Sequence, residues 1–368
     1  MTYTEKAIKK GPPTAACFRY FKLGDYYING DVKFVIRILR CFAHNGNYNI
    51  GCQSFHIGRK RIVRDLLKCI VLTRKDNVKV LPIYGDLVIP VQGGLKLFDI
   101  ENRKVTKYAV SLSDRTDLEQ EYKKALNAAQ TNFAPVIVDS DIHQGWYSEA
   151  LVQGACPHKW SPQKAEQYVE RNYRDIARLA CKVAIVGAPK EVLVETYVKK
   201  LVKRIDELCA NKAELEWFYR DLENFKGEAV DHLGTYSNSK ISICFSHGDF
   251  SLVNFIDNNG EIVVLDWESC GYRSSTNDVC NFAITEQYYG RSKEGDLTLL
   301  HLLLKEYDAN LDEERKHSKK LELVLGLYYL ERLEVLLNRS MSQTLNRVLK
   351  KSLNLFQRIG FPSDTRTA

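Results

Sequence analysis

The sequence contains no continuous apolar run near the length of about 18 residues that a membrane-spanning helix requires. Its first 20 residues carry several charges and Pro12-Pro13 instead of an apolar segment. The ten cysteines include no Cys-x-x-Cys pair, and no histidines stand at zinc-finger spacing. We therefore expect a cytoplasmic protein with neither a spanning helix nor a signal peptide, whose cysteines are mostly buried, reduced thiols.

Internal repeats, heptad runs and low-complexity segments are also missing from the sequence. Hydrophobic residues make up 45% of the chain and charged residues 27%, which are ordinary proportions for a globular protein. A length of 368 residues favours two domains and is ample for a substantial core.

The net charge of +7 is unevenly distributed, because residues 1–80 hold 16 Lys and Arg against 5 Asp and Glu. Residues 31–42 and 58–70 each place apolar side chains on one helical face and basic side chains on another. Such helices can lie on an anionic membrane, or they can pack as solvated helices on the domain that follows. We do not expect a nucleic-acid partner, because no aromatic-interleaved binding motif accompanies the basic residues.

The most informative feature is His247-Gly248-Asp249, followed by Asn254 and then by Asp266. An apolar, β-prone segment precedes the first group, and Asn258-Asn259-Gly260 predicts a tight hairpin between Asn254 and Asp266. Each piece alone is also typical of an ordinary Asx turn or strand end. Together, in this order, they place two carboxylates and an amide where phosphoryl transfer needs an acceptor-orienting group and hard metal ligands.

The segment before residue 155 contains matching features. Gly93-Gly94 is predicted at the tip of a hairpin, where backbone amides could approach phosphates or merely form a turn. Lys107 lies in the middle of a predicted strand, where a lysine is costly without an anionic partner. Glu121 follows on a predicted helix, with Glu119 as its competitor for that lysine.

These residues resemble the aminoglycoside phosphotransferase and choline kinase group of small-molecule kinases, which share the protein-kinase fold. The resemblance implies an α+β, two-lobed structure with a small β-rich N-lobe and a larger, mainly helical C-lobe. We expect the N-lobe at residues 81–154, the C-lobe at 155–368, and a basic helical extension at 1–80. In this reading the hairpin that ends at Asp266 belongs to the C-lobe.

The resemblance also implies roles for individual residues. Asp249 corresponds to the catalytic residue, and Asn254 and Asp266 correspond to ligands of Mg²⁺. Asp278 is expected to cap a helix and brace the catalytic loop. The expected cofactors are ATP and Mg²⁺. The residues expected to contact the nucleotide are Lys107, Glu121, Gly93, Gly94 and Glu149, the last at the start of an adenine-binding edge that runs to Gly154.

We therefore predict transfer of the ATP γ-phosphoryl group to a hydroxyl of a small molecule or saccharide. No long activation segment separates Asp266 from Asp278, which disfavours a regulated protein kinase. Two alternatives stay open: a kinase of lipid-linked saccharides at the membrane surface, and a nucleotide-binding pseudokinase. Candidate acceptor contacts in the helical lobe and beside Asp266 are Tyr168, Tyr173, Trp217, Tyr219, Glu268, Tyr272 and Arg273.

Overall fold

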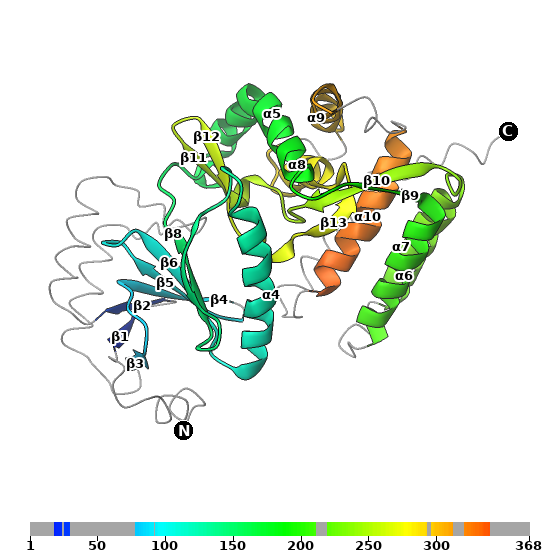
Figure 1. Ribbon diagram of the computed structural model, residues 1–368. Coiled ribbons are helices and arrows are strands. Elements are labelled where there is room, and N and C mark those ends of the chain that lie inside the picture. The colour runs from blue at the N-terminus through cyan, green and yellow to red at the C-terminus, as the bar shows by residue number, and fades with distance from the viewer. Residues whose placement is uncertain are drawn as a thin grey trace. The chain divides into compact units, whose positions relative to one another are not determined.

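The computed structural model describes residues 18–23, 26–29, 78–91, 93–210, 219–292, 296–311 and 320–338. These residues form two units, shown in Figure 1. Unit 1 comprises the described residues up to Lys159 together with Phe255–Glu268, and unit 2 comprises the described residues of 160–254 and from Ser269 onward. The helices predicted at 31–42 and 58–70 lie outside the described residues, as does a further helix that apolar residues at helical spacing predict at 342–359.

Unit 1 is built on an antiparallel sheet of eight strands in the order β3-β1-β2-β4-β5-β6-β8-β7. Tyr20, Leu95 and Leu97 are among the side chains buried in its core. The strands are β1 (Phe18–Leu23), β2 (Tyr26–Asn29), β3 (Val78–Leu81), β4 (Leu87–Val91), β5 (Gly94–Asp99), β6 (Lys104–Tyr108), β7 (Ile137–Asp141) and β8 (Trp146–Ala150).

The sheet reaches into the first 80 residues, where we expected a helical extension. β1 and β2 form a hairpin that pairs with β3 on one side and with β4 on the other. The hydroxyl of Tyr20 donates a hydrogen bond to the carbonyl of Ile83 at 2.7 Å, which ties β1 to the loop before β4. A boundary at residue 80 therefore does not separate the sheet from the chain that precedes it.

Helix α4 (Leu112–Ala128) covers part of this sheet (Figure 1). Ser111 caps it by accepting a hydrogen bond from the Asp114 amide, and Asp114 accepts one from the Ser111 amide in return. Leu118 and Ala125 then pack against Tyr147 of β8. The cap fixes where the helix begins, and the buried face fixes its rotation, so Glu121 is directed toward the sheet.

The hairpin of β11 (Phe255–Asn258) and β12 (Glu261–Val264) groups with unit 1, although we expected it in the C-lobe. Ala155 and Asp257 exchange two backbone hydrogen bonds of 2.8 Å, and the amide of Val264 donates to the carbonyl of Phe133 at 2.8 Å. These bonds between segments distant in sequence attach the hairpin, and with it Asp266, to the sheet unit.

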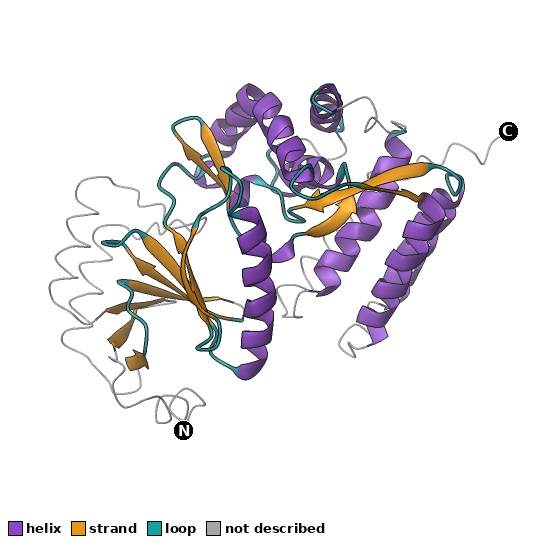
Figure 2. Ribbon diagram, in the orientation of Figure 1, coloured by secondary structure: helices purple, strands orange, loops and turns teal. Residues whose placement is uncertain are grey.

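Unit 2 is mainly helical, as the purple ribbons of Figure 2 show. Its helices are α5 (Pro162–Ala184), α6 (Val194–Ala210), α7 (Tyr219–Gly234), α8 (Asn277–Tyr288), α9 (Thr298–Ala309) and α10 (Leu321–Asn338). A small sheet joins β9 (Lys190–Leu193), β10 (Lys240–Ser246) and β13 (Gly271–Ser274). Within the described residues, no helix is both long and apolar enough to cross a bilayer.

Apolar residues at helical spacing predict a helix from Lys190 to Cys209, but α6 begins only at Val194. Residues 190–193 form β9 because they pair with residues 240–243 of β10, so a tertiary contact overrides the local helical pattern. Ser161-Pro162 predicts the start of another helix, and the start of α5 agrees: Ser161 accepts a hydrogen bond from the Lys164 amide at 3.4 Å, and proline follows at the first helical position.

Helix α10 is buried around most of its circumference and organises unit 2. Its Glu331 is fully buried and accepts hydrogen bonds from four donors, so its charge is well solvated by protein groups. Burial nevertheless raises the pKa of Glu331, and the hydrogen bonds partly oppose that rise. The donors are the Tyr197 hydroxyl, the Ser274 amide and hydroxyl, and the Asn277 side-chain amide, at 2.6 to 2.8 Å.

Candidate active site

The loop of residues 247–254, which we call the catalytic loop after its predicted role, follows β10 in unit 2. Gly248 has a φ of +75°, and a side chain there would lie 2.4 Å from the carbonyl oxygen of Ser269. No side chain fits so close to backbone, so only glycine allows the chain to turn here. The turn brings Asp249 out of the buried strand, and its side chain is 24% exposed.

Asp278, in the first turn of α8, stabilises the backbone at His247 and Gly248 through hydrogen bonds. One of its carboxylate oxygens accepts hydrogen bonds from the Ser246 hydroxyl at 2.8 Å and the Gly248 amide at 3.1 Å. The other accepts from the His247 amide at 2.9 Å. The expected bracing role is thus confirmed, but capping is not: Thr276 occupies the cap position of α8 and makes no side-chain cap bond.

Asn254 is anchored to Asp249. Its side-chain nitrogen donates to the Asp249 carbonyl at 2.9 Å and to the Asp249 carboxylate at 3.3 Å. Both bonds use the NH₂ group, so the amide oxygen points elsewhere, and no described residue donates a hydrogen bond to it. Asn254 as a whole is only 4% exposed, and an amide oxygen held in this way is a suitable ligand for a hard cation.

Arg332 of α10 also contacts Asp249, a contact that was not predicted from the sequence. One terminal nitrogen, Nη1, donates to the Asp249 carboxylate at 3.1 Å and to the Gly248 carbonyl at 3.2 Å. Its helix position is fixed by the neighbouring Glu331. In the sequence, Arg332 stands 83 residues after Asp249, in a leucine-rich helix where a solvated arginine is common.

Unit 1 carries a second polar group, which we call the lysine–carboxylate cluster. Lys107 of β6 is 6% exposed and makes an ion pair with Glu121 of α4. Its Nζ also lies 3.3 Å from Asp266 and 3.8 Å from Glu149. Burial lowers the pKa of Lys107, but the surrounding carboxylates dominate and hold it well above its usual value. The competitor Glu119 instead pairs with Lys123, on the exposed face of α4, at 2.8 Å.

Lys96 is the fifth member of this cluster and was not assigned a role from sequence. It stands directly opposite Lys107 in the pairing of β5 with β6, and its Nζ lies 3.3 Å from the same oxygen of Asp266. Burial opposes ionisation of Asp266, but Lys96 and then Lys107 hold its pKa well below the usual range. Asp266 also has a φ of +65°, a left-handed conformation rare for a residue with a side chain and frequent at functional sites.

Carboxylate oxygens of Glu121, Asp266 and Glu268 lie within 4.8 Å of one another. Such an oxygen set suits a hard divalent cation such as Mg²⁺. Asp266 in unit 1 and Asn254 in unit 2 were expected to share a metal ion, and each presents an oxygen suited to that role. The two residues belong to different units of the structure.

Two further expectations for the nucleotide site have different structural outcomes. Gly93 and Gly94 do lie at the tip of the β4–β5 hairpin. Glu149 was expected on an adenine-binding edge, but it lies within β8 with its carboxylate near Lys107. This follows from the register, because residues 149 and 147 of β8 pair with 105 and 107 of β6 and so share a face.

Some of the residues proposed as acceptor contacts are buried, and others are exposed. Tyr168 is 8% exposed and packs edge-on against Trp160, so it belongs to the core. Arg273 is also buried, whereas Tyr272 is 50% exposed. Tyr289, which the sequence did not single out, is 44% exposed and feels the charges of both Asp249 and Arg332, so it borders the catalytic loop. Trp217 lies outside the described residues.

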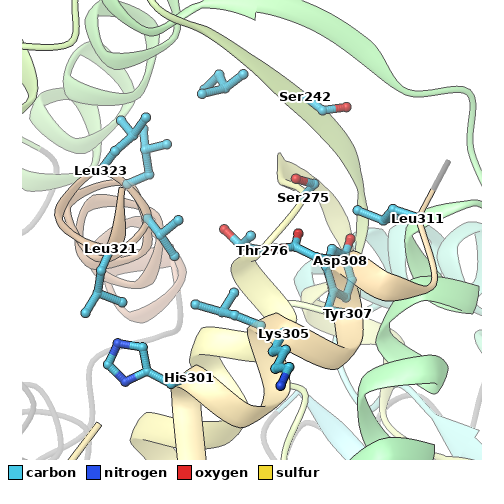
Figure 3. Close-up of a pocket in the computed structure, with 14 residues that line it drawn as sticks. Ser242, Ser275, Thr276, His301, Lys305, Tyr307, Asp308, Leu311, Leu321 and Leu323 are labelled. Atoms are coloured by element: carbon cyan, nitrogen blue, oxygen red, sulfur yellow. The ribbon is translucent and has the colours of Figure 1, made fainter. Parts of the chain in front are cut away.

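Unit 2 also contains a cavity of about 300 Å³ that does not include Asp249 (Figure 3). His301 and Lys305 reach it from α9, while Leu321 and Leu323 line it from α10. Its lining is mainly apolar and has no carboxylate apart from Asp308. The cavity therefore lacks the paired acid and amide found at the catalytic loop.

Comparison with known proteins bears on the fold. No protein-family model matches the chain, and no curated protein matches its sequence. A choline/ethanolamine kinase family protein from Mesorhizobium loti has a similar structure, with 14% identity, a TM-score of 0.50, and coverage of 74% of this chain and 87% of that one. Choline kinase LicA from Streptococcus pneumoniae is similar with 10% identity, a TM-score of 0.51, and coverage of 81% and 99%.

At sequence identities this low, the structural similarity establishes the fold alone. The chain has the α+β, two-lobed fold of the choline kinase-like proteins, as the resemblance of its motifs implied. The prediction of the fold class is confirmed.

Proposed function

We propose that this protein is an ATP-dependent phosphotransferase that moves the γ-phosphoryl group to a hydroxyl of a small molecule or saccharide. The observation that carries the proposal is the pairing of Asp249 with Asn254, whose anchored NH₂ group leaves an amide oxygen for a cation. The lysine–carboxylate cluster of unit 1 supports it independently. The structural neighbours with TM-scores of 0.50 and 0.51 are, by their descriptions, a choline/ethanolamine kinase family protein and a choline kinase.

In this proposal Asp249 orients the acceptor hydroxyl and receives its proton. Asn254 and Asp266 would each supply an oxygen ligand to Mg²⁺, which when bound would offset the charge of the phosphates. Lys107, kept in place by Glu121, contacts the α- and β-phosphates, and the Gly93-Gly94 turn covers them. Most of the rate enhancement comes from positioning and from preorganised charge, because the reaction requires little covalent participation by the protein.

A screen of ATP consumption across sugars, aminoglycosides, choline-like amines and lipid-linked saccharides tests this function. We expect at least one acceptor to stimulate turnover in the wild-type protein. Asp249→Asn should lower kcat by about 10²- to 10⁴-fold, because it removes the general base while keeping the shape of the side chain. Mg·ATP affinity, measured by calorimetry, should stay within about threefold, because Asp249 faces the acceptor and not the nucleotide.

The control for this variant is Asp257→Asn, which changes a carboxylate on β11 that accepts a hydrogen bond from the Gly260 amide in a surface turn. This control should retain wild-type turnover. Turnover of Asp249→Asn at the wild-type rate would overturn the assignment of the base. Mg·ATP binding without turnover on any acceptor would instead favour the pseudokinase alternative.

A further inference from the structure

The guanidinium of Arg332 is only half used within the described part of unit 2. Its Nη1 donates to the Asp249 carboxylate and to the Gly248 carbonyl. Neither Nη2 nor Nε has a hydrogen-bond partner among the described residues. The unused Nη2 and Nε together form the edge of a guanidinium that binds carboxylate or phosphate through two parallel hydrogen bonds.

The hydrogen bond between Nη1 and the Asp249 carboxylate fixes the position of the unused guanidinium edge of Arg332. The Arg332 side chain is 13% exposed, so its charge is partly desolvated and interacts more strongly than on an open surface. The same nitrogen that contacts Asp249 also contacts the loop backbone, so the guanidinium cannot move without disturbing the catalytic loop. An oxyanion bound to the remaining edge would therefore lie beside the Asp249 carboxylate.

The surroundings favour an anion over a cation at this place. Tyr288 and Tyr289, at the end of α8, both feel the positive charge of Arg332. The guanidinium of Arg291 lies over the Tyr289 ring at 4.7 Å. A quaternary ammonium or an amine binds to aromatic faces and carboxylates that are free of competing cations. Here arginines already occupy the Asp249 carboxylate and the Tyr289 ring.

We propose that Arg332 binds an oxyanion of the acceptor, so that the substrate is a hydroxyl compound carrying a carboxylate or a phosphate. This inference rests on the proposed function for its reaction. The acceptor oxygen would form a bond to the γ-phosphorus, the bond from that phosphorus to the β–γ bridging oxygen of ATP would break, and the hydroxyl proton would pass to Asp249. The products are ADP and the phosphorylated anion.

A matched series of small acceptors separates the charge of the substrate from its shape. Glycerol, D-glycerate, glycerol 3-phosphate and choline each present a hydroxyl on a short carbon chain, and glucose, gluconate, glucose 6-phosphate and glucosamine repeat the comparison on a larger one. Binding is measured by calorimetry on the full chain without nucleotide, and phosphorylation is measured separately with Mg·ATP. We expect an anionic member to bind at least about tenfold more tightly than its neutral and cationic counterparts.

Three variants test the role of Arg332. Arg332→Gln should reduce the anion preference to about threefold or less, and Arg332→Lys should restore part of it, because lysine keeps the charge without the fork. Asp249→Asn should keep or strengthen anion binding, because it frees the guanidinium from its carboxylate; a merely structural role for Arg332 would not produce that result. The control Arg171→Gln removes a positive charge from the exposed face of α5 and should keep the wild-type preference.

Thermal melting establishes whether each variant is folded. If Arg332→Gln does not fold, the Arg332→Lys and Asp249→Asn variants still decide the test. Equal or tighter binding of neutral or cationic members, no binding of any anion at millimolar concentration, or an anion preference that survives the loss of Arg332 would overturn the inference. Phosphorylation of acceptors without regard to charge would leave the proposed function intact and refute only this inference. Arg332-dependent anion binding without any phosphorylation would refute the function alone.

Discussion

Lys96 and Lys107 stand opposite each other on neighbouring strands and share one oxygen of Asp266. Like charges directly opposite each other in a sheet are unfavourable, so their pairing requires an anion between them. Asp266 provides one negative charge for the two lysines, and Glu121 balances the second. The phosphates of a bound nucleotide would add further negative charge at this point, which makes Lys96 a second phosphate contact under the proposed function.

We expect Lys96→Ala to raise the KM for Mg·ATP by about three- to tenfold while lowering kcat less than Lys107→Ala does. The reason is that Lys107 is buried and fixed by Glu121, whereas the Lys96 side chain is 25% exposed and its charge is better screened. Steady-state kinetics at varied ATP measure this split. Lys123→Ala, on the exposed face of α4, is the matched control. An unchanged KM in Lys96→Ala would restrict phosphate contact to Lys107.

For individual residues, short-range sequence patterns were sufficient to predict part of the site. A lysine in a strand predicted a nearby acid, with Glu119 left open as a competitor of Glu121, and the structure shows the contact with Glu121. Arg332 and Lys96 could not be predicted in the same way. Each reaches its partner, Asp249 or Asp266, across more than 80 residues of sequence, and such contacts depend on tertiary packing that no local spacing encodes.

Gly93 and Gly94 are adjacent, but they serve the β4–β5 hairpin differently. A side chain at Gly94 would lie 2.2 Å from the carbonyl oxygen of Tyr108 on β6, whereas a side chain at Gly93 would meet nothing within 4 Å. The requirement for glycine at position 94 thus comes from the close approach of β6 in addition to a φ of +155°. At position 93 it comes only from the φ of +77°.

Gly94→Ala should therefore destabilise the protein by about 2–4 kcal/mol, because a backbone oxygen must move to admit the new methyl group. Gly93→Ala, the matched control one residue away, should cost about 1 kcal/mol through backbone conformation alone. Urea unfolding of both variants measures the difference. Equal destabilisation by the two substitutions would show that the β5–β6 contact is not the constraint.

Helix α8 ends in a buried ion pair that makes stability depend on pH. Glu286 and Arg291 have side chains that are 2% and 5% exposed, and their charged atoms approach to 2.7 Å. Burial raises the pKa of Glu286 to about 7, and Arg291 only partly offsets that rise. Because the folded pKa exceeds the unfolded one, the folded state binds the proton more tightly. The resulting stability is fully present below about pH 4.5 and is lost as pH rises through about 7.

The wild-type free energy of unfolding should consequently contain a component of about 3 kcal/mol that decreases between about pH 4.5 and 7. Glu286→Gln removes the titrating group, so this variant should show a shallower decrease over the same window. Urea unfolding at several pH values compares the two slopes, whatever the absolute stability of the variant. Parallel slopes would mean that Glu286 titrates near its ordinary pKa in the folded protein.

Elements were predictable where their signals were local. The Asn258-Asn259-Gly260 turn, the Ser161 cap and the Gly93-Gly94 tip all appear in the structure at the expected places. The strand at residues 190–193 was missed because its only distinguishing feature is the partner strand β10. β1 and β2 were missed for the same reason, since β1 pairs with residues 78–81 across a long intervening segment.

At the scale of the whole molecule, the first 80 residues contribute both strands and charge. β1 and β2 extend the sheet of unit 1, so part of this segment is structural. Its excess of Lys and Arg over Asp and Glu is not explained by those strands, because half of its 16 Lys and Arg lie in the segments 31–42 and 58–70. Those segments were predicted as basic amphipathic helices, and they remain a prediction.

If these helices present their faces to solvent, the protein should bind anionic membranes reversibly. Each Lys or Arg near such a surface contributes roughly 1 kcal/mol, and the attraction weakens as salt screens it. Full-length protein should therefore pellet with vesicles containing phosphatidylserine but not with neutral phosphatidylcholine vesicles, and added salt should release it. Replacing Arg37, Arg40, Arg59 and Arg64 by Gln should abolish pelleting, whereas replacing Lys199 and Lys203 on the exposed face of α6 should not.

The result also bears on the acceptor. Membrane binding through these segments would bring the enzyme to lipid-linked saccharides, so the phosphotransferase would act at the bilayer surface. Failure to pellet at low salt would place the apolar faces of the segments against protein, because amphipathic helices with this charge would otherwise be attracted to the vesicles. The basic residues would then form a rim around unit 1, and a water-soluble acceptor would be favoured.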